Sequence, residues 1–434
     1  MLSIITTHPI QYQIPLWRAL AADGRVPFEV WFLTRHGAEV TRDKEFGKSF
    51  AWDVDPLEGY PHRFLRVNAD WDVNRFWGVR LAESLVPLIR ELGVRAVWLQ
   101  GWQVMAYWQA AGQAKAAGAE VWLRGESNDI APRPMWKRLL RRAALGRLFS
   151  KVDHFLCIGS ANRRLYEAMG VAEEKLHWAP YCVDNARFAR QAAILRHPGG
   201  APAPASSGGT IGSERSRIRR EWRIPDDAFC VLFCGKFIAK KRPGDLVAAA
   251  RRLEARGARL GARGEGLHVL FVGSGELGSA LRIACDVTFD AEAVPASVRA
   301  KPERPQAPSL APLASNDAPR ASFAGFLNQT QIPRAYAAAD CLVLPSDPGE
   351  TWGLVVNEAM ASGLPCVVSD ACGCAEDLVG PELRYPCGDV EALAGAIAHV
   401  MQNREALAAR CRERVKAFDL GATVDAVAEI WNHG

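Results

Sequence analysis

Residues 340–369 constrain the fold more than any other part of the chain, because strand-like and helix-like patterns alternate there. Residues 340–346 are a short apolar run that ends in Pro and Ser, which is typical of a buried parallel strand entering a loop. Residues 352–362 contain good helix formers, and Gly363 lies where a left-handed helix stop is expected. Residues 365–369 form the next apolar run. The segment therefore predicts strand, loop, helix and strand, the repeating unit of a doubly wound parallel α/β sheet.

Two glutamates, Glu350 and Glu358, lie near the start and in the middle of this expected helix. Ligands of open α/β sheets bind beyond the carboxyl ends of the strands, and the free N–H groups of Gly353, Leu354 and Val355 would attract an anion there. Carboxylates do not coordinate phosphate, but they accept hydrogen bonds from hydroxyl groups. The pattern therefore favours a diphosphate at the helix start and glutamates that contact sugar and ribose. The alternative is that Glu350 only caps the helix and Glu358 only faces solvent.

Four segments resemble, in the same order, the motifs of the retaining glycosyltransferases of the family-4 group (glycosyl transferases group 1), which have the two-domain GT-B fold. The segments are residues 234–243, 268–276, 322–327 and 345–360. Together they cover essentially the whole second half of the chain. The resemblance implies two Rossmann-like domains, each with a doubly wound parallel sheet, that face a cleft.

The resemblance also implies roles for individual residues. Lys236 and Lys241 would hold the donor diphosphate, and both would act in catalysis. Glu350 would hold the hydroxyls of the donor sugar, and Glu358 would hold the ribose. The family usually has Arg at the position of Lys236, so bidentate contact with phosphate is lost there. No cofactor and no acidic metal site are implied. The other donor-binding residues implied by the motifs are Gly235, Gly273, Gly275, Phe326, Leu327, Thr351, Trp352, Gly353, Leu354 and Val355.

The length of 434 residues exceeds what one hydrophobic core usually supports, so two domains are expected. Apolar runs of strand length alternate in the first half with helical patterns, among them residues 76–92 and 163–169. The expected strands are residues 2–7, 28–33, 96–99, 120–124, 154–158 and 175–178. The expected parts are an acceptor-binding domain at 1–190, a flexible linker at 191–214, a nucleotide-sugar-binding domain at 215–415 with a surface insertion at about 291–320, and a C-terminal helix at 416–434 that crosses back to the first domain.

Polar residues after two of the expected strands are candidates for the acceptor side. His8, Gln11 and Gln13 follow the first strand, where family members usually have a glycine-rich loop. Arg124 and Glu126 follow another strand. Glu126 can orient or deprotonate the acceptor hydroxyl, and Arg124 can hold phosphate or an acidic sugar. Two structural alternatives stay open, namely a hydrogen-bonded structural His8 and a buried Arg124–Glu126 pair that fixes the loop.

Composition excludes several classes of partner and ligand. A net charge of +5 is small for this length, and without a nucleic-acid-binding module nucleic acid is not an expected partner. No apolar run reaches the ~18 residues of a membrane-spanning helix, and the start lacks a basic export region, so a cytoplasmic protein is expected. The eleven cysteines are scattered over apolar runs, as expected for buried thiols in a reducing compartment. Cys372 and Cys374 are a close pair without further ligands at metal spacing, so no metal site is expected.

Residues 133–151 form a basic amphipathic pattern with seven cations and no acid. Such a helix can bind anionic lipid at ~1 kcal/mol per cation near the surface, which would suit a lipid-linked acceptor and a peripheral position on the inner face of the membrane. The alternative is a domain helix with a solvated basic face.

The sequence therefore predicts a retaining, metal-independent hexosyltransferase that uses a nucleoside-diphosphate sugar, with UDP among the candidate nucleotides. Its acceptor would be a hydroxyl of a glycan or a lipid-linked molecule in the synthesis of cell-surface polysaccharide or glycolipid. The alternatives are a nucleotide-sugar epimerase of the same fold and a catalytically idle scaffold.

Overall fold

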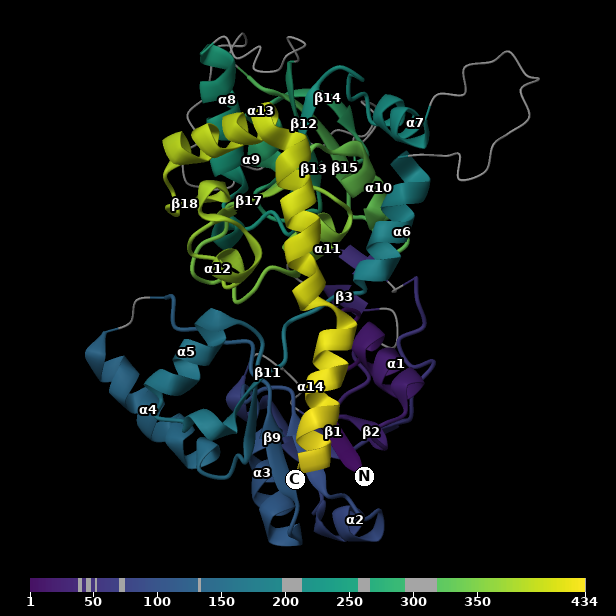
Figure 1. Cartoon of the computed structure of the whole chain (residues 1–434), viewed down its shortest axis with the longest axis vertical. Coiled ribbons are helices and arrows are strands. Elements are labelled where there is room, and N and C mark those ends of the chain that lie inside the picture. Colours follow the sequence, from purple (N-terminus) through teal and green to yellow (C-terminus); the bar gives the residue numbers. More distant parts are fainter. Residues whose placement is uncertain are drawn as a thin grey trace, which may run out of the picture. The chain divides into compact units, whose positions relative to one another are not determined.

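The computed structural model describes residues 1–37, 41–43, 48–50, 53–69, 75–131, 134–196, 213–256, 266–292 and 318–433. The chain divides into two compact units, each built on its own seven-stranded sheet (Figure 1). Unit 1 consists of Met1–Thr41, Ser49–Asp184 and Ala417–Gly434, and unit 2 consists of Arg42–Lys48 and Asn185–Lys416. Most of the expected linker at 191–214 and most of the expected insertion at 291–320 lie outside the described residues.

The sheet of unit 1 is parallel throughout, with strand order β11-β10-β9-β8-β1-β2-β5. The chain adds strands outward from β1 in one direction and then from β8 in the other, so the switch in strand order lies between β1 and β8. The strands are β1 (Leu2–Thr6), β2 (Phe28–Phe32), β5 (His62–Phe64), β8 (Ala96–Leu99), β9 (Glu120–Leu123), β10 (His154–Cys157) and β11 (Leu176–Trp178). The helices are α1 (Ile14–Asp23), α2 (Val86–Glu91), α3 (Met105–Ala117), α4 (Met135–Phe149), α5 (Ser160–Ala168) and α14 (Leu420–His433), with 3-10 turns η1 (Phe76–Gly78) and η2 (Glu173–Lys175).

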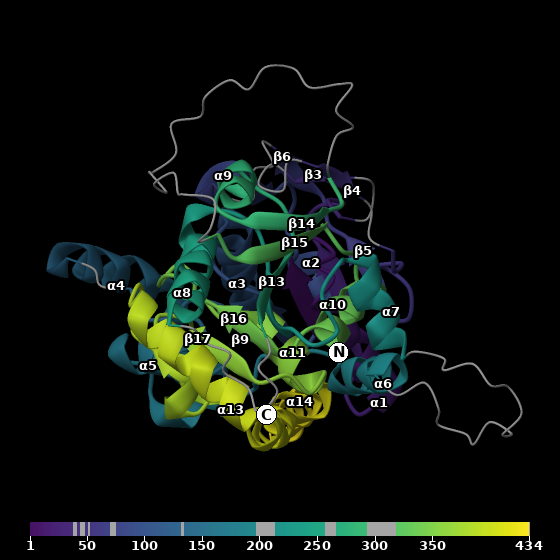
Figure 2. The same cartoon turned by 90° about the horizontal axis from the view of Figure 1, so that it is seen from above.

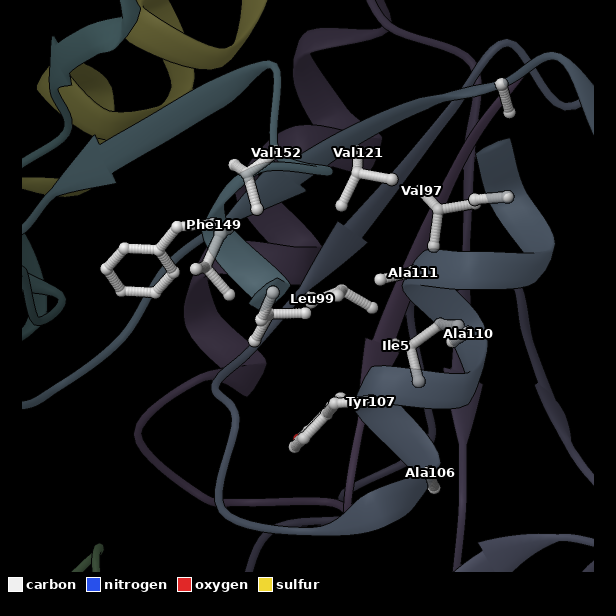
Figure 3. Close-up of a cluster of buried hydrophobic side chains, with 14 of the residues drawn as sticks. Ile5, Val97, Leu99, Ala106, Tyr107, Ala110, Ala111, Val121, Phe149 and Val152 are labelled. Atoms are coloured by element: carbon white, nitrogen blue, oxygen red, sulfur yellow. The ribbon is translucent and has the colours of Figure 1, made fainter. Parts of the chain in front are cut away.

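Two hydrophobic clusters cover the two faces of this first sheet. Successive side chains of a strand point to opposite faces, so Leu2 and Ile4 of β1 join one cluster while Ile5 joins the other. The first cluster packs against α1 and α14, which contact each other. The second packs against α3, where Tyr107 and Ala110 lie beside the strand residues (Figure 3). The sheet is thus the middle layer of three, as expected for a doubly wound fold.

The sheet of unit 2 is also parallel throughout, with strand order β14-β15-β13-β12-β16-β17-β18. The switch in strand order lies between β12 and β16. Helices α8 and α9 lie on one side of this sheet and α10 on the other (Figure 2). The strands are β12 (Phe229–Cys234), β13 (Leu267–Val272), β14 (Asp286–Asp290), β15 (Arg320–Gly325), β16 (Cys341–Leu344), β17 (Cys366–Ser369) and β18 (Arg384–Tyr385). The helices are α6 (Asn185–Arg196), α7 (Glu214–Glu221), α8 (Pro243–Ala255), α9 (Gly278–Ile283), α10 (Ile332–Ala338), α11 (Leu354–Ala361), α12 (Ala375–Leu378) and α13 (Val390–Val415), with 3-10 turns η3 (Ala239–Lys241) and η5 (Pro381–Leu383).

Local sequence signals explain several of the helix ends. Pro15 stands in the first turn of α1, where its missing N–H costs nothing, and Gly24 ends the helix with a left-handed φ of 71°. The side chain of Asp389 accepts a hydrogen bond from the N–H of Ala392 and so caps α13. The 3-10 turn η6 (Lys416–Phe418) leads into α14.

One expected helix is wrong. Residues 76–92 form the turn η1, the strand β7 (Val79–Leu81) and only the short helix α2. β7 pairs antiparallel with β6 (Val67–Ala69) outside the main sheet, so its apolar residues belong to a hairpin and not to a helix face. A further small sheet joins β3 (Thr41–Asp43) and β4 (Lys48–Phe50). The six expected strands of the first half correspond to β1, β2, β8, β9, β10 and β11.

Candidate functional site

The loops after β12 and β16 lie at the switch in strand order of the second sheet, where these two strands are neighbours. Doubly wound sheets bind ligands beyond the carboxyl ends of the strands at such a point. Lys236 and Lys241 lie on the loop after β12, and Glu350 lies on the loop after β16. The N–H of Asp347 donates to the carbonyl of Lys240 at 2.8 Å, which ties the two loops together.

Lys241 and Glu350 form an ion pair between Nζ and Oε2. The exposed fractions of these side chains are 18% and 12%, so water screens the pair only partly. The hydroxyl of Ser346 donates to the same carboxylate oxygen at 3.1 Å. The structure thus brings together a cation that was expected to contact the diphosphate and a carboxylate that was expected to contact the donor sugar. An incoming diphosphate would compete with Glu350 for Lys241.

Glycines keep the neighbouring loops free of side chains. A Cβ atom added at Gly273 would lie 2.0 Å from the carbonyl oxygen of Gly235, and one at Gly275 would lie 2.7 Å from the carbonyl oxygen of Phe237. Both glycines have positive φ angles, 129° and 153°. The N–H of Phe237 donates to the carbonyl of Ser274 at 2.9 Å, which holds the loops after β12 and β13 together. The backbone at this edge can therefore approach a ligand closely.

Helix α11 begins at Leu354, later than the expected start at Trp352, because Gly353 has a left-handed φ of 105°. Trp352 is buried, and its Nε1 donates to Oδ1 of Asn357 at 2.9 Å. Among the described residues, no side chain caps the N-terminus of α11. The first N–H groups of the helix, including that of Val355, therefore point to the same edge as Lys241 without a side-chain partner and favour an anion there.

Glu358 lies within α11 and does not simply face solvent. The hydroxyl of Tyr336 donates to its Oε2 at 2.5 Å. Burial raises the pKa of Glu358, while the hydrogen bond from Tyr336 and the charge of Arg187 oppose that rise. The hydroxyl of the buried Tyr336 thus fixes the orientation of the Glu358 carboxylate. A side chain that binds a ligand hydroxyl needs such a fixed orientation.

The remaining expected donor residues lie around the same edge. Phe326 and Leu327 follow β15 directly and are half-buried. Thr351 is exposed between Glu350 and the start of α11.

In unit 1, the expected acceptor-side residues lie on the loops after β1 and β9. The hydroxyls of Tyr12 and Tyr181 both donate to Oε1 of Glu126, the first at 3.5 Å. Within the described residues, Glu126 has no ion pair with Arg124. The buried Arg124–Glu126 pair considered as an alternative is therefore not present, and two tyrosines hold the carboxylate instead.

Arg124 is almost completely buried and stacks on the ring of Tyr181, with 4.8 Å between Cζ and the ring centre. Its Nε and Nη2 have no hydrogen-bond partner among the described residues. Unpaired buried N–H groups on a cation are costly, and a carboxylate or phosphate beside them would remove that cost.

His8 contacts Thr7 and His36. Nδ1 of His8 lies 2.9 Å from the hydroxyl of Thr7, and the two histidine rings meet edge to face at 5.2 Å. Burial, and next the neighbouring His36, lower the pKa of His8 to about 4, so its imidazole is neutral near pH 7. Gln13 accepts a hydrogen bond from Thr6 at 3.2 Å, whereas Oε1 of Gln11 is buried without a partner among the described residues.

The structure shows no metal-binding arrangement in the ranges that it describes, where no three His, Cys, Asp or Glu side chains are grouped to hold an ion. Cys372 and Cys374 are buried, and burial raises the pKa of both thiols. Among the same described residues, no helix has both the length and the apolarity to cross a bilayer.

Sequence reasoning missed the tyrosines that orient the two glutamates. Tyr336 lies in the alanine-rich helix α10, and Tyr12 and Tyr181 lie on loops far apart in the sequence. None of them belongs to a motif with fixed spacing, so only the tertiary contacts reveal them. Ser346 was within the recognised segment, and its hydroxyl beside Glu350 was the one available signal.

Comparison with known proteins assigns the second unit to a family. Residues 214–418 match the family profile described as glycosyl transferases group 1. This part of the chain belongs to that family. The matched residues include both lysines and both glutamates of the edge described above.

Three curated proteins are similar to parts of this chain. A GDP-mannose-dependent alpha-mannosyltransferase of Mycobacterium tuberculosis is 42% identical over 98 residues, 21% of this chain and 25% of that protein. The sulfoquinovosyl transferase SQD2 of Arabidopsis thaliana is 35% identical over 125 residues, 26% of this chain and 24% of that protein. A D-inositol 3-phosphate glycosyltransferase of a Nocardioides species is 30% identical over 232 residues, 50% of this chain and 44% of that protein. The matches thus span less than half of the length of each relative.

Solved structures show the fold of the whole chain. HepE of Anabaena, in a complex with UDP, superposes with a TM-score of 0.65 at 14% identity, covering 100% of this chain and 99% of HepE. WaaG, a glycosyltransferase involved in lipopolysaccharide biosynthesis, superposes with a TM-score of 0.54 at 13% identity, covering 100% of both chains. The chain has the GT-B fold, and the expected fold class is confirmed.

Proposed function

We propose that the chain is a retaining glycosyltransferase that moves a hexose from a nucleoside-diphosphate sugar to a hydroxyl of a glycan or a lipid-linked acceptor. The observation that carries this proposal is the Lys241–Glu350 pair at the switch in strand order, beside the uncapped start of α11. A cation and a helix start suit a diphosphate, and the adjacent carboxylate suits sugar hydroxyls.

The chemistry follows from where charge develops. As the bond between the sugar and the diphosphate breaks, negative charge grows on the phosphate oxygens. Lys236, Lys241 and the N–H groups at the start of α11 stabilise that charge, in the role that a metal ion has in other transferases. Glu350 binds hydroxyls of the donor sugar, and Glu358 binds the ribose of the nucleotide.

The stereochemistry is part of the proposal. In retention the new bond forms on the same face of the sugar from which the diphosphate leaves. The leaving phosphate oxygen can guide the acceptor hydroxyl to that face and can accept its proton. In unit 1, Glu126, oriented by two tyrosine hydroxyls, and the neutral His8 are the groups that can hold the acceptor hydroxyl. Arg124, with its unpaired N–H groups, would bind an acidic group of the acceptor.

The donor is open between two nucleotides. The mannosyltransferase relative is described as GDP-mannose-dependent, and HepE was solved with UDP and with UDP-glucose. The first experiment is therefore a panel of UDP-, GDP- and ADP-hexoses with lipid-linked and oligosaccharide acceptors, with product analysis by mass spectrometry and NMR. Transfer with retained anomeric configuration is the expected outcome.

The panel has a matched pair of variants. Lys241→Ala removes the paired lysine, whereas Lys240→Ala removes its exposed neighbour on the same turn. Lys241→Ala should lower kcat by about 10²–10³, the usual loss for one group that stabilises developing charge, and Lys240→Ala should leave kcat nearly unchanged. Equal kcat in both variants would remove the basis of the proposal. Conversion of the donor without any acceptor would indicate an epimerase instead.

Helix α4 suits contact with an anionic membrane that carries a lipid-linked acceptor. Four large apolar side chains near its start are 59–74% exposed, namely Met135, Trp136, Leu139 and Leu140. Its buried side chains lie near its other end, at Leu145, Leu148 and Phe149, and the first turns of α4 project from the unit (Figure 1). Lysines and arginines alternate with the exposed apolar residues. We propose that this face inserts at the lipid headgroups, with the cations on anionic lipid.

A further inference from the structure

A polar cavity lies at the end of the sheet of unit 2 that is opposite to the donor edge. The donor edge is at the carboxyl ends of β12 and β16, whereas this cavity is bordered by the residues just before β12, β16 and β17. Its volume is about 560 Å³, within the range of pockets that hold small molecules. Five arginines line it, namely Arg196, Arg215, Arg219, Arg404 and Arg412.

One buried carboxylate, Asp340, organises three of these arginines. Arg219 contacts its Oδ2 at 2.6 Å, and Arg215 contacts its Oδ1 at 2.7 Å. Arg404 also contacts Oδ1, and the N–H of Cys230 donates to Oδ2 at 2.9 Å. A carboxylate has about four acceptor sites, so Asp340 has no capacity left for another cation. One negative charge therefore faces three positive ones.

The other two arginines add charge without a carboxylate partner among the described residues. Nη2 of Arg196 donates to the carbonyl of Tyr336 at 2.8 Å, and its buried Nε has no partner among the described atoms. A Cβ atom added at Gly363 would lie 3.2 Å from Nη1 of Arg412 and 3.4 Å from Nη1 of Arg196. The two guanidinium groups thus converge over one glycine. Burial, and next the charge of Arg215, lower the pKa of Arg196 to about 10, although Asp340 opposes this.

The acids that border the cavity lie at its rim. Asp226, Asp227 and Glu405 are exposed, and Asp226 contributes its carbonyl oxygen, not its carboxylate, to Arg219. Water screens their charges, as it does those of Arg404 and Arg412, which are also exposed, whereas Arg219 is buried and Arg196 and Arg215 are half-buried. The interior of the cavity is therefore positive, and like charges held together without a counter-ion are a cost that a bound anion would remove.

We propose that this arginine pocket binds a small phosphorylated molecule at a site separate from the donor edge. Guanidinium groups match phosphate oxygens with two parallel hydrogen bonds, which a lysine cannot offer. Arg412 and Arg196 would hold the phosphoryl group, because their N–H groups are the ones not committed to Asp340. Arg215, Arg219 and Arg404 would supply the surrounding positive potential. The proposal is independent of the transferase activity, since it requires no residue of the donor edge.

The test measures binding of inorganic pyrophosphate to the full chain by isothermal titration calorimetry. The parent is the double variant Lys236→Ala/Lys241→Ala, because pyrophosphate would otherwise also bind at the donor edge. Saturable binding should persist in this parent, and Arg412→Glu should weaken it at least tenfold. The matched control is Arg410→Glu, on the same helix α13, where Arg410 pairs with Glu382 and does not line the cavity. This control should bind as the parent does.

Further arms separate a site from general charge effects and from misfolding. Sodium chloride at equal ionic strength should give no saturable heat. If Arg412→Glu does not fold by circular dichroism, Arg412→Gln, which removes the charge without reversing it, must show the loss. Absence of saturable binding in the parent, or equal affinity in the Arg412 and Arg410 variants, would overturn the proposal. A negative result in this parent does not bear on the donor proposal, because that proposal is tested separately with the Lys241→Ala variant.

Discussion

The ammonium group of Lys241 is paired with the carboxylate of Glu350, 109 positions further along the chain, at the carboxyl edge of the second sheet. In the ligand-free chain each group therefore satisfies the other. In the proposed binding mode a donor would separate them, because the diphosphate would take the cation and the sugar hydroxyls would take the carboxylate. The two roles can be separated by substitution.

Glu350→Gln keeps the size of the side chain and frees Lys241. The affinity for the nucleoside diphosphate should stay constant or rise several-fold, because the phosphate no longer competes with a carboxylate. The kcat for transfer should fall about 10- to 100-fold, since hydrogen bonds to charged groups contribute about 1.5–3 kcal/mol. Calorimetry with the diphosphate and steady-state kinetics check both. A parallel loss of nucleotide affinity and kcat would contradict these separate roles.

Glu358→Gln should change stability in a pH-dependent way. Burial raises the pKa of Glu358, so the folded chain keeps this proton to a higher pH than the unfolded chain. Stability is therefore lost as pH rises from the ordinary Glu value, about 4.3, through the raised value. The Gln variant lacks this loss, so its Tm relative to the wild type should increase as the pH rises above about 4.

The matched control for Glu358→Gln is Glu405→Gln, because Glu405 is exposed on α13. Its Tm difference from the wild type should stay constant over the same pH range. The donor KM should rise in the Glu358 variant and not in the control. A constant Tm difference in both variants would show that Glu358 is ordinarily ionised.

His8→Gln should remove an acid-sensitive contribution to stability. Burial and His36 lower the pKa of His8 to about 4, below the ordinary value of about 6.5. Between these values the unfolded chain binds the proton and the folded chain does not, so His8 stabilises the fold less as pH falls from about 6.5 to 4. The Gln variant should show a shallower decline in unfolding free energy over this interval, by at most about 3 kcal/mol, since one pKa unit corresponds to about 1.4 kcal/mol. NMR should find the His8 ring neutral at pH 6, and a protonated ring there would contradict the prediction.

Gly273→Ala should disrupt the loops at the donor edge. The added methyl would clash with the carbonyl of Gly235 at 2.0 Å and would occupy a φ of 129°. We expect a loss of about 2–4 kcal/mol in unfolding free energy, or failure to bind any nucleotide. Gly112→Ala in α3 is the control, because its Cβ meets no atom, and it should raise stability by up to about 1 kcal/mol. Equal Tm values for both variants would contradict the close approach.

Substitution of the exposed face of α4 should weaken membrane binding. Leu139→Asp/Leu140→Asp removes two apolar side chains that are 62% exposed. Co-sedimentation with vesicles that contain phosphatidylglycerol should fall at least tenfold, with transfer to a water-soluble acceptor unchanged. The control is Ile283→Asp, which changes an apolar residue that is 81% exposed on α9. Binding that does not depend on either position, or that is equal on neutral vesicles, would exclude the contact.

The strands could be predicted from the sequence because they are buried on both faces. Runs such as residues 229–234 in β12 and 267–272 in β13 are continuously apolar, so length and bounding residues are sufficient to locate them. The helix expected at residues 76–92 was wrong, because the spacing of their apolar residues also fits a helix. The strand β7 forms only by pairing with β6, which the local sequence does not reveal. The edge strand β5 is short and only half-buried, which leaves a weak apolar signal.

The site could be predicted only as far as its motifs extend. Lys241 and Glu350 were located by local pattern and by family resemblance, and the structure joins them. The contacts that orient the carboxylates come from residues far away in the sequence. Tyr181 is 55 positions from Glu126, and Tyr336 is 22 positions from Glu358. No spacing rule covers such contacts, since they depend on how helices and loops pack.

Tyr336 makes one hydrogen bond through its main-chain carbonyl and another through its side-chain hydroxyl. Its carbonyl accepts from Arg196 at 2.8 Å, in the arginine pocket, and its hydroxyl donates to Glu358 at 2.5 Å, toward the donor edge. A ligand that displaces Arg196 would therefore act on the same residue that orients the carboxylate of Glu358. Binding in the arginine pocket would then affect Glu358 through a single residue, and Tyr336→Phe, which lacks the hydroxyl, would remove this coupling while leaving the arginine pocket unchanged.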